Sequence, residues 1–132
     1  MRNGTEMGPP PDLGTASPRI LVVEDEMNAA MLIEGMVNEL SFEIAAVVPR
    51  LEDAMRLVDI DDFDVAMLDV HLNGKTVLPF AAELDTRQIP YLFATAYGGR
   101  GITAQFQDHL VLEKPFGPLE LSRTLLALTG RA

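Results

Sequence analysis

Short apolar runs recur along the chain from Arg19 onward, and a segment of different periodicity follows each of them. The runs hold several β-branched residues and few polar interruptions, and they cover residues 20–23, 44–48, 65–68, 91–94 and 110–112. Near-continuous apolar runs of this length are typical of parallel strands that are covered on both faces. The pattern therefore predicts five strands of an α/β domain, with helices packed on the sheet.

The segments after these runs place apolar residues three or four positions apart, which puts them on one face of a helix. Four such faces are formed by Ala30, Ile33, Val37 and Leu40, by Leu51, Ala54, Met55 and Val58, by Val77, Phe80, Ala81 and Leu84, and by Leu121, Leu125 and Leu128. Gly117 followed by Pro118 is a favoured cap and first residue for the last of these helices.

The fourth connection, after residue 95, departs from this rhythm. Glycines stand at positions 98, 99 and 101, and a glycine inside a helix costs about 1 kcal/mol relative to alanine. The residues that follow, 102–108, are enough for about two helical turns. We therefore expect the fourth helix to be short, frayed or missing.

Composition narrows the class of protein. The chain has 132 residues and no cysteine, so we expect one domain without disulfides or thiolate metal sites. Residues 1–18 are rich in glycine and proline and predict a disordered tail before a domain at 19–132. The formal net charge of −10 opposes binding to nucleic acid. With no long apolar run and no secretory signal, we expect a cytoplasmic protein that does not contact membranes.

Polar residues gather directly after the predicted strands. In doubly wound sheets, ligands bind beyond the carboxyl ends of the strands, where strand order reverses. The residues at these ends are Glu24, Asp25 and Glu26 after the first strand, Asp69 after the third, Thr95 after the fourth, and Lys114 and Pro115 after the fifth. A lone strand-end aspartate often caps a helix, but residues 71–74 delay the helix after Asp69 until about Thr76. Glu26 is interpreted as a solvated or first-turn acid.

The carboxylates of Glu24, Asp25 and Asp69 are hard oxygen donors, which suit Mg²⁺. An aspartate carboxylate can also act as a nucleophile and form an aspartyl phosphate, while a metal offsets the charge of the incoming group. Asp69 is the favoured nucleophile because it ends the most apolar strand. Lys114 is then placed to neutralise a transferred phosphoryl group, and the Thr95 hydroxyl to donate to an anion.

These motifs resemble the receiver domain of two-component response regulators. The acidic run at 20–26, Asp69 followed by Gly74, Thr95 with Ala96, and the turn at 114–116 are similar to four receiver motifs in the same order. Residues 90–98 further resemble the FAT GUY subfamily of single-domain receivers, which is associated with alphaproteobacterial stress signalling. Ala96 stands where that subfamily has glycine.

The resemblance implies a flavodoxin-like (CheY-like) doubly wound parallel sheet with strand order 2-1-3-4-5. It also implies that a sensor histidine kinase, or a histidine phosphotransfer protein, transfers a phosphoryl group to Asp69. Mg²⁺ would be held by Asp25, Asp69 and the backbone carbonyl of His71, with Glu24 acting largely through water.

Further roles follow from the same resemblance. Thr95 and Lys114 would bind the phosphoryl oxygens, and the peptide bond between Lys114 and Pro115 would be cis, as it usually is in receivers. Such a protein catalyses only its own phosphorylation and dephosphorylation. It signals by protein contact or acts as a phosphate sink.

Some positions differ from the common receiver pattern. Val111 stands where many receivers carry a switch aromatic, so a ring swing in the fifth strand is unavailable. Ala96 and Tyr97 follow the switch position, and Tyr97 is either the reporter of phosphorylation or a ring packed on the fourth connection. His71 either tunes the attack of water or is a solvent-facing loop residue, and His109 is interpreted as structural.

Two other functions are weighed against the response regulator. An aspartate-nucleophile phosphohydrolase of small phosphate esters generally needs a second aspartate where this chain has His71. A phosphorylation-independent pseudo-receiver is disfavoured because Asp25, Asp69, Thr95 and Lys114 are all present. A short fourth helix removes much of the surface through which receivers often dimerise, so we expect a monomer.

Overall fold

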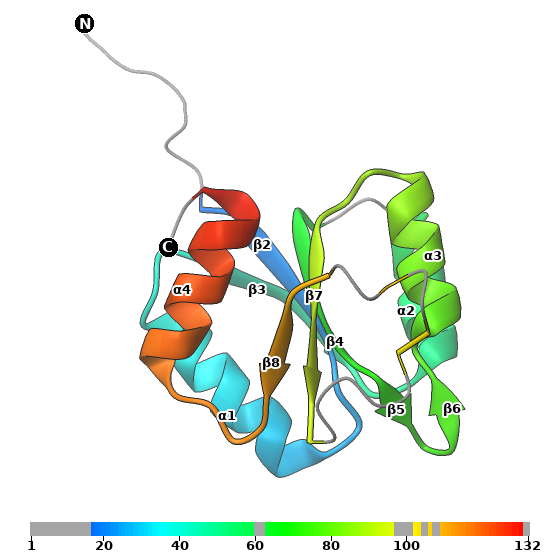
Figure 1. Ribbon diagram of the computed structural model, residues 1–132, viewed down its shortest axis with the longest axis horizontal. Helices are drawn as coiled ribbons and strands as arrows, with labels where there is room; N and C mark the ends of the chain where they lie inside the picture. Colours follow the sequence, from blue (N-terminus) through cyan, green and yellow to red (C-terminus); the bar gives the residue numbers. More distant parts are fainter. Residues whose placement is uncertain (1–16, 60–62, 97–101, 104–105, 107–108, 131–132) are drawn as a thin grey trace, which may run out of the picture.

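The computed structural model describes residues 17–59, 63–96, 102–103, 106 and 109–130. A five-stranded parallel sheet stands between two pairs of helices in this part of the chain (Figure 1). The sheet strands are β2 (Arg19–Val23), β3 (Glu43–Val48), β4 (Val65–Asp69), β7 (Tyr91–Thr95) and β8 (Val111–Glu113). The helices are α1 (Met27–Asn38), α2 (Leu51–Val58), α3 (Leu78–Thr86) and α4 (Pro118–Thr129). None of these helices is long and apolar enough to cross a membrane.

The order of strands in the sheet is β3-β2-β4-β7-β8, and all four neighbouring pairs are parallel. In chain order these are the second, first, third, fourth and fifth predicted strands, so the expected flavodoxin-like order is confirmed. The direction in which strands are added to the sheet reverses between β2 and β4. The chain first adds β3 on one side of β2 and then adds β4, β7 and β8 on the other side. Ligands of such sheets bind at the carboxyl ends of β2 and β4.

Successive residues of each strand point to opposite faces of the sheet, and the buried side chains divide accordingly into two cores. Leu21, Val23, Ala66 and Leu68 pack with Ala54 of α2 and with Phe80, Ala81 and Leu84 of α3. Ile20, Val22, Val65 and Met67 pack with Ile33 and Val37 of α1 and with Leu121 and Leu125 of α4. Burial on both faces explains why the strands read as continuous apolar runs rather than as alternating ones.

A hairpin that the sequence analysis did not predict follows β4. It consists of β5 (His71–Leu72) and β6 (Lys75–Thr76), which pair antiparallel. Asn73 and Gly74 form its turn, with φ angles of 49° and 81°. Positive φ at both positions is typical of a type I′ turn, which favours Asn-Gly. Because this hairpin intervenes, the next helix begins at Leu78 rather than near Thr76.

The fourth connection joins β7 to β8. Its described residues form no α-helix, in agreement with the expected short or missing fourth helix. Ile102 and Phe106 are buried in the core beside α2 and α3, where the Phe106 ring meets Phe93 edge-on with centroids 6.2 Å apart. The predicted tail at 1–18 lies outside the described residues, apart from its last two.

Candidate functional site

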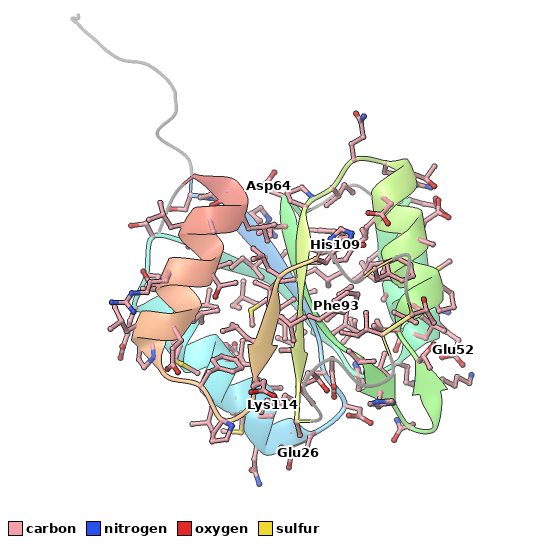
Figure 2. The ribbon with its side chains drawn as sticks, viewed as in Figure 1. Glu26, Glu52, Asp64, Phe93, His109 and Lys114 are labelled. Atoms are coloured by element: carbon pink, nitrogen blue, oxygen red, sulfur yellow. The ribbon has the colours of Figure 1, made fainter. Side chains whose placement is uncertain are left out.

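Four charged side chains converge at one end of the sheet. Glu24 and Asp25 directly follow β2, Asp69 ends the neighbouring strand β4, and Lys114 directly follows β8. Figure 2 shows Lys114 at the same end of the molecule as Glu26, at the start of α1. The parallel topology is the cause, because it brings the carboxyl ends of all these strands to one edge.

The three carboxylates form a compact cluster. One oxygen each from Glu24, Asp25 and Asp69 lies within 4.8 Å of the other two. Glu24 is 2% exposed, and the two aspartates are partly buried. Several carboxylate oxygens around one point are the donor set of a hard divalent cation, and Mg²⁺ is held by one or two carboxylates with water completing its shell. The cluster therefore fits Mg²⁺.

Lys114 is paired with this cluster. Its Nζ lies 2.5 Å from Oε1 of Glu24 and 3.6 Å from Oδ2 of Asp69. The backbone at Lys114 is held in place because Lys114 N donates to the carbonyl oxygen of Thr95 over 2.9 Å. The peptide bond between Lys114 and Pro115 is cis, as expected. The sequence did not predict this direct pair between Lys114 and Glu24. The pair forms because a carboxylate this deeply buried is costly without a cation.

Backbone donors satisfy other carboxylate oxygens of the cluster. Glu26 N donates to Oε2 of Glu24 over 3.1 Å, and Asn73 N donates to Oδ2 of Asp25 over 2.9 Å. The second contact is a functional feature that the sequence analysis missed, although the Asn-Gly dipeptide in the sequence signals the turn that provides it.

Glu26 has a structural role at the start of α1. Its Oε1 accepts from Ala29 N over 2.7 Å, so Glu26 is the N-cap residue of the helix. A side-chain acceptor at this position satisfies one of the free N–H groups of the first turn. Glu26 is exposed, as the expected solvated acid would be, and it stands directly before the first turn of the helix. It lies outside the carboxylate cluster.

Asp69 has a strongly perturbed acidity. Burial raises its pKa to about 7 and the negative charge of Glu24 acts in the same direction, while Lys114 opposes both. The backbone N–H of His71 faces Oδ1 of Asp69 at 3.4 Å, which is a long contact. Perturbed carboxylates beside opposing charges are typical of functional sites.

The remaining predicted residues are distributed as follows. Thr95 ends β7 and is fully buried, Ala96 is exposed next to it, and His71 begins β5 with an exposed side chain. Tyr97, for which the sequence leaves open a reporter role or a ring packed on the fourth connection, lies outside the described residues. The structure thus brings Glu24, Asp25, Asp69 and Lys114 into one cluster.

His109 lies away from this cluster, as the sequence analysis expects (Figure 2). Its ring stacks on Tyr91 with centroids 4.5 Å apart, and its Nε2 lies 3.0 Å from the Tyr91 hydroxyl. The same hydroxyl donates toward Asp85, whose negative charge adds to burial in raising the Tyr91 pKa. These contacts tie the end of the fourth connection to β7 and α3.

An apolar groove of about 380 Å³ opens beside the cluster. Leu32, Ile33 and Met36 of α1 form one wall, and Ala96, Lys114, Pro115 and Phe116 are among the residues of the other. Leu32 is 68% exposed, and Met27 and Met31 on the same helix are also exposed. The groove and the charged cluster share Lys114, so a molecule seated in the groove would lie next to the carboxylates.

Known proteins resemble this chain over most of its length. The profile of the response regulator receiver domain matches residues 20–126. The transcriptional regulatory protein PdtaR of Mycobacterium tuberculosis is 28% identical over 119 residues, which are 86% of this chain and 58% of PdtaR. The chain therefore spans less than two thirds of that relative.

Solved structures show the same fold. The solution structure of SdrG from Sphingomonas melonis Fr1 has a TM-score of 0.78 and 34% identity, covering 86% of this chain and 97% of SdrG. The receiver domain of the sensor histidine kinase PA1611 from Pseudomonas aeruginosa PAO1 has a TM-score of 0.72 and 25% identity, covering 87% of this chain and 99% of that domain. That domain was crystallised with a magnesium ion coordinated in its active site cleft.

Proposed function

This chain belongs to the response regulator receiver domain family, and we propose that it is a Mg²⁺-dependent phosphoryl acceptor in which Asp69 is the acceptor group. One observation carries the proposal. Oxygens of Glu24, Asp25 and Asp69 lie within 4.8 Å of one another, and the Lys114 ammonium lies between Glu24 and Asp69. Carboxylates that can bind a cation and an ammonium group that can bind an anion thus lie around one nucleophilic carboxylate, that of Asp69.

The proposed reaction uses these groups in distinct ways. A carboxylate oxygen of Asp69 attacks the phosphorus atom of the donor, the bond from phosphorus to the donor's nitrogen or oxygen breaks, and an aspartyl phosphate forms. Bound Mg²⁺ would offset the charge of the phosphoryl oxygens. Lys114 is already 3.6 Å from Asp69, so its ammonium can turn from Glu24 to a phosphoryl oxygen, and Thr95 would bind another.

The metal would be held by the groups that already cluster. Asp25 and Asp69 would be direct ligands, the backbone carbonyl of His71 a third, and Glu24 would act largely through water. The charge of Mg²⁺ also favours the ionised form of Asp69, which the nucleophile requires. The presence of magnesium in the related PA1611 receiver domain supports this assignment.

A protein donor is supported by the apolar groove. Receiver domains interact with sensor histidine kinases, and the proposed donor here is such a kinase or a histidine phosphotransfer protein. The groove runs between α1 and the Lys114–Phe116 turn and includes Ala96 and Lys114. A helix that packed there would bring a phosphohistidine to the carboxylate cluster while burying apolar area on both partners.

We extend the proposal to a stand-alone regulator of the FAT GUY type in the cytoplasm, acting by protein contact or as a phosphate sink. The Phe93-Ala94-Thr95 stretch supports the subfamily assignment. The described residues of the fourth connection form no α-helix, and a short or missing fourth helix would favour a monomer, because it reduces the helical surface through which receivers often dimerise.

One experiment tests the central step. Wild type and the Asp69→Asn variant are incubated with Mg²⁺ and a small acyl phosphate, and intact mass is recorded with and without a chelator. We expect a single phosphate adduct only on wild type and only with Mg²⁺. An unmodified wild-type protein would support the pseudo-receiver, and repeated turnover of the donor would support the phosphohydrolase.

A further inference from the structure

The β5–β6 hairpin contacts two of the three clustered carboxylates through its backbone. Asn73 N, in the turn, donates to Oδ2 of Asp25 over 2.9 Å, and His71 N, at the hairpin's start, faces Oδ1 of Asp69 at 3.4 Å. Asp25 follows β2 and Asp69 ends β4, so one short element touches carboxylates from two different strands. The shorter of the two contacts is made to Asp25, which is more exposed than Asp69 and lies in the loop after β2, whereas Asp69 belongs to a strand.

The hairpin is itself held at three places. At its base, Val77 N donates to the carbonyl oxygen of Val70 over 2.9 Å. In its first strand, the Leu72 side chain is 2% exposed and lies in the core beside α2 and α3. In its second strand, Lys75 Nζ lies 3.1 Å from Oε2 of Glu52 in the first turn of α2. An element fixed in this way can orient a side chain that it contacts.

We propose that the hairpin at residues 71–76 is a positioning element for the metal site, which holds Asp25 in its binding orientation through the Asn73 N–H. The inference rests on the proposed function, because it concerns the affinity of the same site for Mg²⁺. A ligand that is already oriented loses less conformational freedom when the metal binds.

Gly74 gives a way to perturb the turn alone. Its φ is 81°, and a Cβ built there has no heavy atom within 4 Å. A larger residue therefore acts through backbone strain and not through a clash, and β-branched residues are the least tolerant of positive φ. Asparagine accepts this conformation more readily than other residues, so Gly74→Asn is the conservative variant.

Gly130 supplies a matched control. Its φ is 77°, and a Cβ there also has no heavy atom within 4 Å. It caps the end of α4 that lies far from the hairpin (Figure 1). Gly130→Val introduces the same kind of strain at a site that touches none of the carboxylates.

The test is a Mg²⁺ titration of the metal-free protein, followed by two-dimensional NMR of the backbone amides. Gly74→Val should weaken Mg²⁺ binding by about three- to ten-fold relative to wild type. Gly74→Asn should bind within about two-fold of wild type, and so should Gly130→Val, whose strain lies outside the site. Thermal unfolding without metal should show comparable losses for the two valine variants.

Equal Mg²⁺ affinity in Gly74→Val and wild type would overturn the inference and leave the proposed function intact. An equal loss in Gly130→Val would also overturn it, since general destabilisation would then explain the effect. Absence of Mg²⁺ binding by wild type at millimolar concentration would instead reject the proposed function, and the role of the hairpin with it.

Discussion

Asp69 and Glu24 lie next to each other in the same cluster, but the structure satisfies their charges differently. Glu24 is 2% exposed and has Lys114 at 2.5 Å together with a backbone donor. Asp69 has the backbone N–H of His71 at 3.4 Å and the Lys114 ammonium at 3.6 Å, and burial raises its pKa to about 7. Of these two carboxylates, the one that is proposed to take the phosphoryl group therefore lies farther from the Lys114 ammonium and from its backbone donor.

The acidity of Asp69 predicts a pH dependence of stability. The native pKa of about 7 lies above the ordinary value of 3.8, so between these values the native state keeps a proton that the unfolded chain has lost. The free energy of unfolding of the metal-free protein should therefore fall as pH rises through this window, by about 1–3 kcal/mol from this group. Urea titrations at pH 5 and pH 8 in the presence of a chelator measure the change.

Asp69→Asn is the control for this pH dependence. The variant should lose most of the decrease between pH 5 and pH 8 and should be more stable than wild type at pH 8. A decrease of the same size in both proteins would assign the pH dependence to other groups and would contradict the proposed burial effect.

The two lysines of the chain should differ sharply in their contribution to stability. Lys114→Met leaves the buried Glu24 without its cation, and breaking a buried pair costs about 3–5 kcal/mol. Lys75 pairs with Glu52 at the surface, where both side chains are more than half exposed, so Lys75→Met should cost less than about 1 kcal/mol. Urea unfolding at pH 7.5 without metal compares the two variants.

A second variant tests the reason for this difference. In the Lys114→Met background, Glu24→Gln removes the unpaired charge and should restore part of the lost stability. If the two single lysine variants were equally stable, or the glutamine gave no recovery, Lys114 would not be the partner that makes burial of Glu24 possible.

At the scale of elements, the sheet and its helices could be predicted because burial leaves a clear pattern in the sequence. Strands covered on both faces are uninterrupted apolar runs, such as residues 65–68, and each helix buries one stripe of residues. The β5–β6 hairpin could not be predicted in this way, because each of its strands has only two residues and is too short to show a hydrophobic periodicity. Its signal is the Asn73-Gly74 turn, which also carries the contact to Asp25.

One position in α1 is occupied by a residue that lowers the stability of the helix. Gly35 lies inside α1 and is exposed, and a Cβ there has no heavy atom within 4 Å. Gly35→Ala should therefore raise the free energy of unfolding by about 0.5–1 kcal/mol, because alanine has the higher helix propensity. Thermal or urea unfolding measures the gain, and a loss of stability would mean that the backbone at Gly35 is not regular helix.

At the scale of the whole molecule, the sequence predicted which residues converge but not how they pair. Parallel strands bring their carboxyl ends to one edge, so Asp25, Asp69 and Lys114 could be placed together from their positions after apolar runs. The pairing of Lys114 with Glu24 could not, because it depends on how deeply each carboxylate is buried. Burial is a property of the folded chain that strand positions do not give.

Binding of Mg²⁺ should stabilise the entire domain. Carboxylates about 4 Å apart repel one another by roughly 1–4 kcal/mol, and a cation that binds only the native state removes this repulsion. At a Mg²⁺ concentration 100 times the dissociation constant, the free energy of unfolding should rise by about 2.7 kcal/mol. Thermal unfolding with Mg²⁺ or with a chelator measures the effect, and Asp25→Asn should reduce it. Identical curves for wild type under both conditions would exclude a native-state metal site.

Locating the modified residue tests whether Asp69 carries the phosphoryl group. The protein is treated with Mg²⁺ and a small acyl phosphate as phosphoryl donor. Borohydride then reduces the aspartyl phosphate on the protein and converts that residue to homoserine. Peptide mass spectrometry then identifies the position. If Asp69 carries the phosphoryl group, homoserine should be found at position 69 in wild type and at no position when Mg²⁺ is removed. Homoserine at position 25, or at no position with Mg²⁺ present, would contradict it.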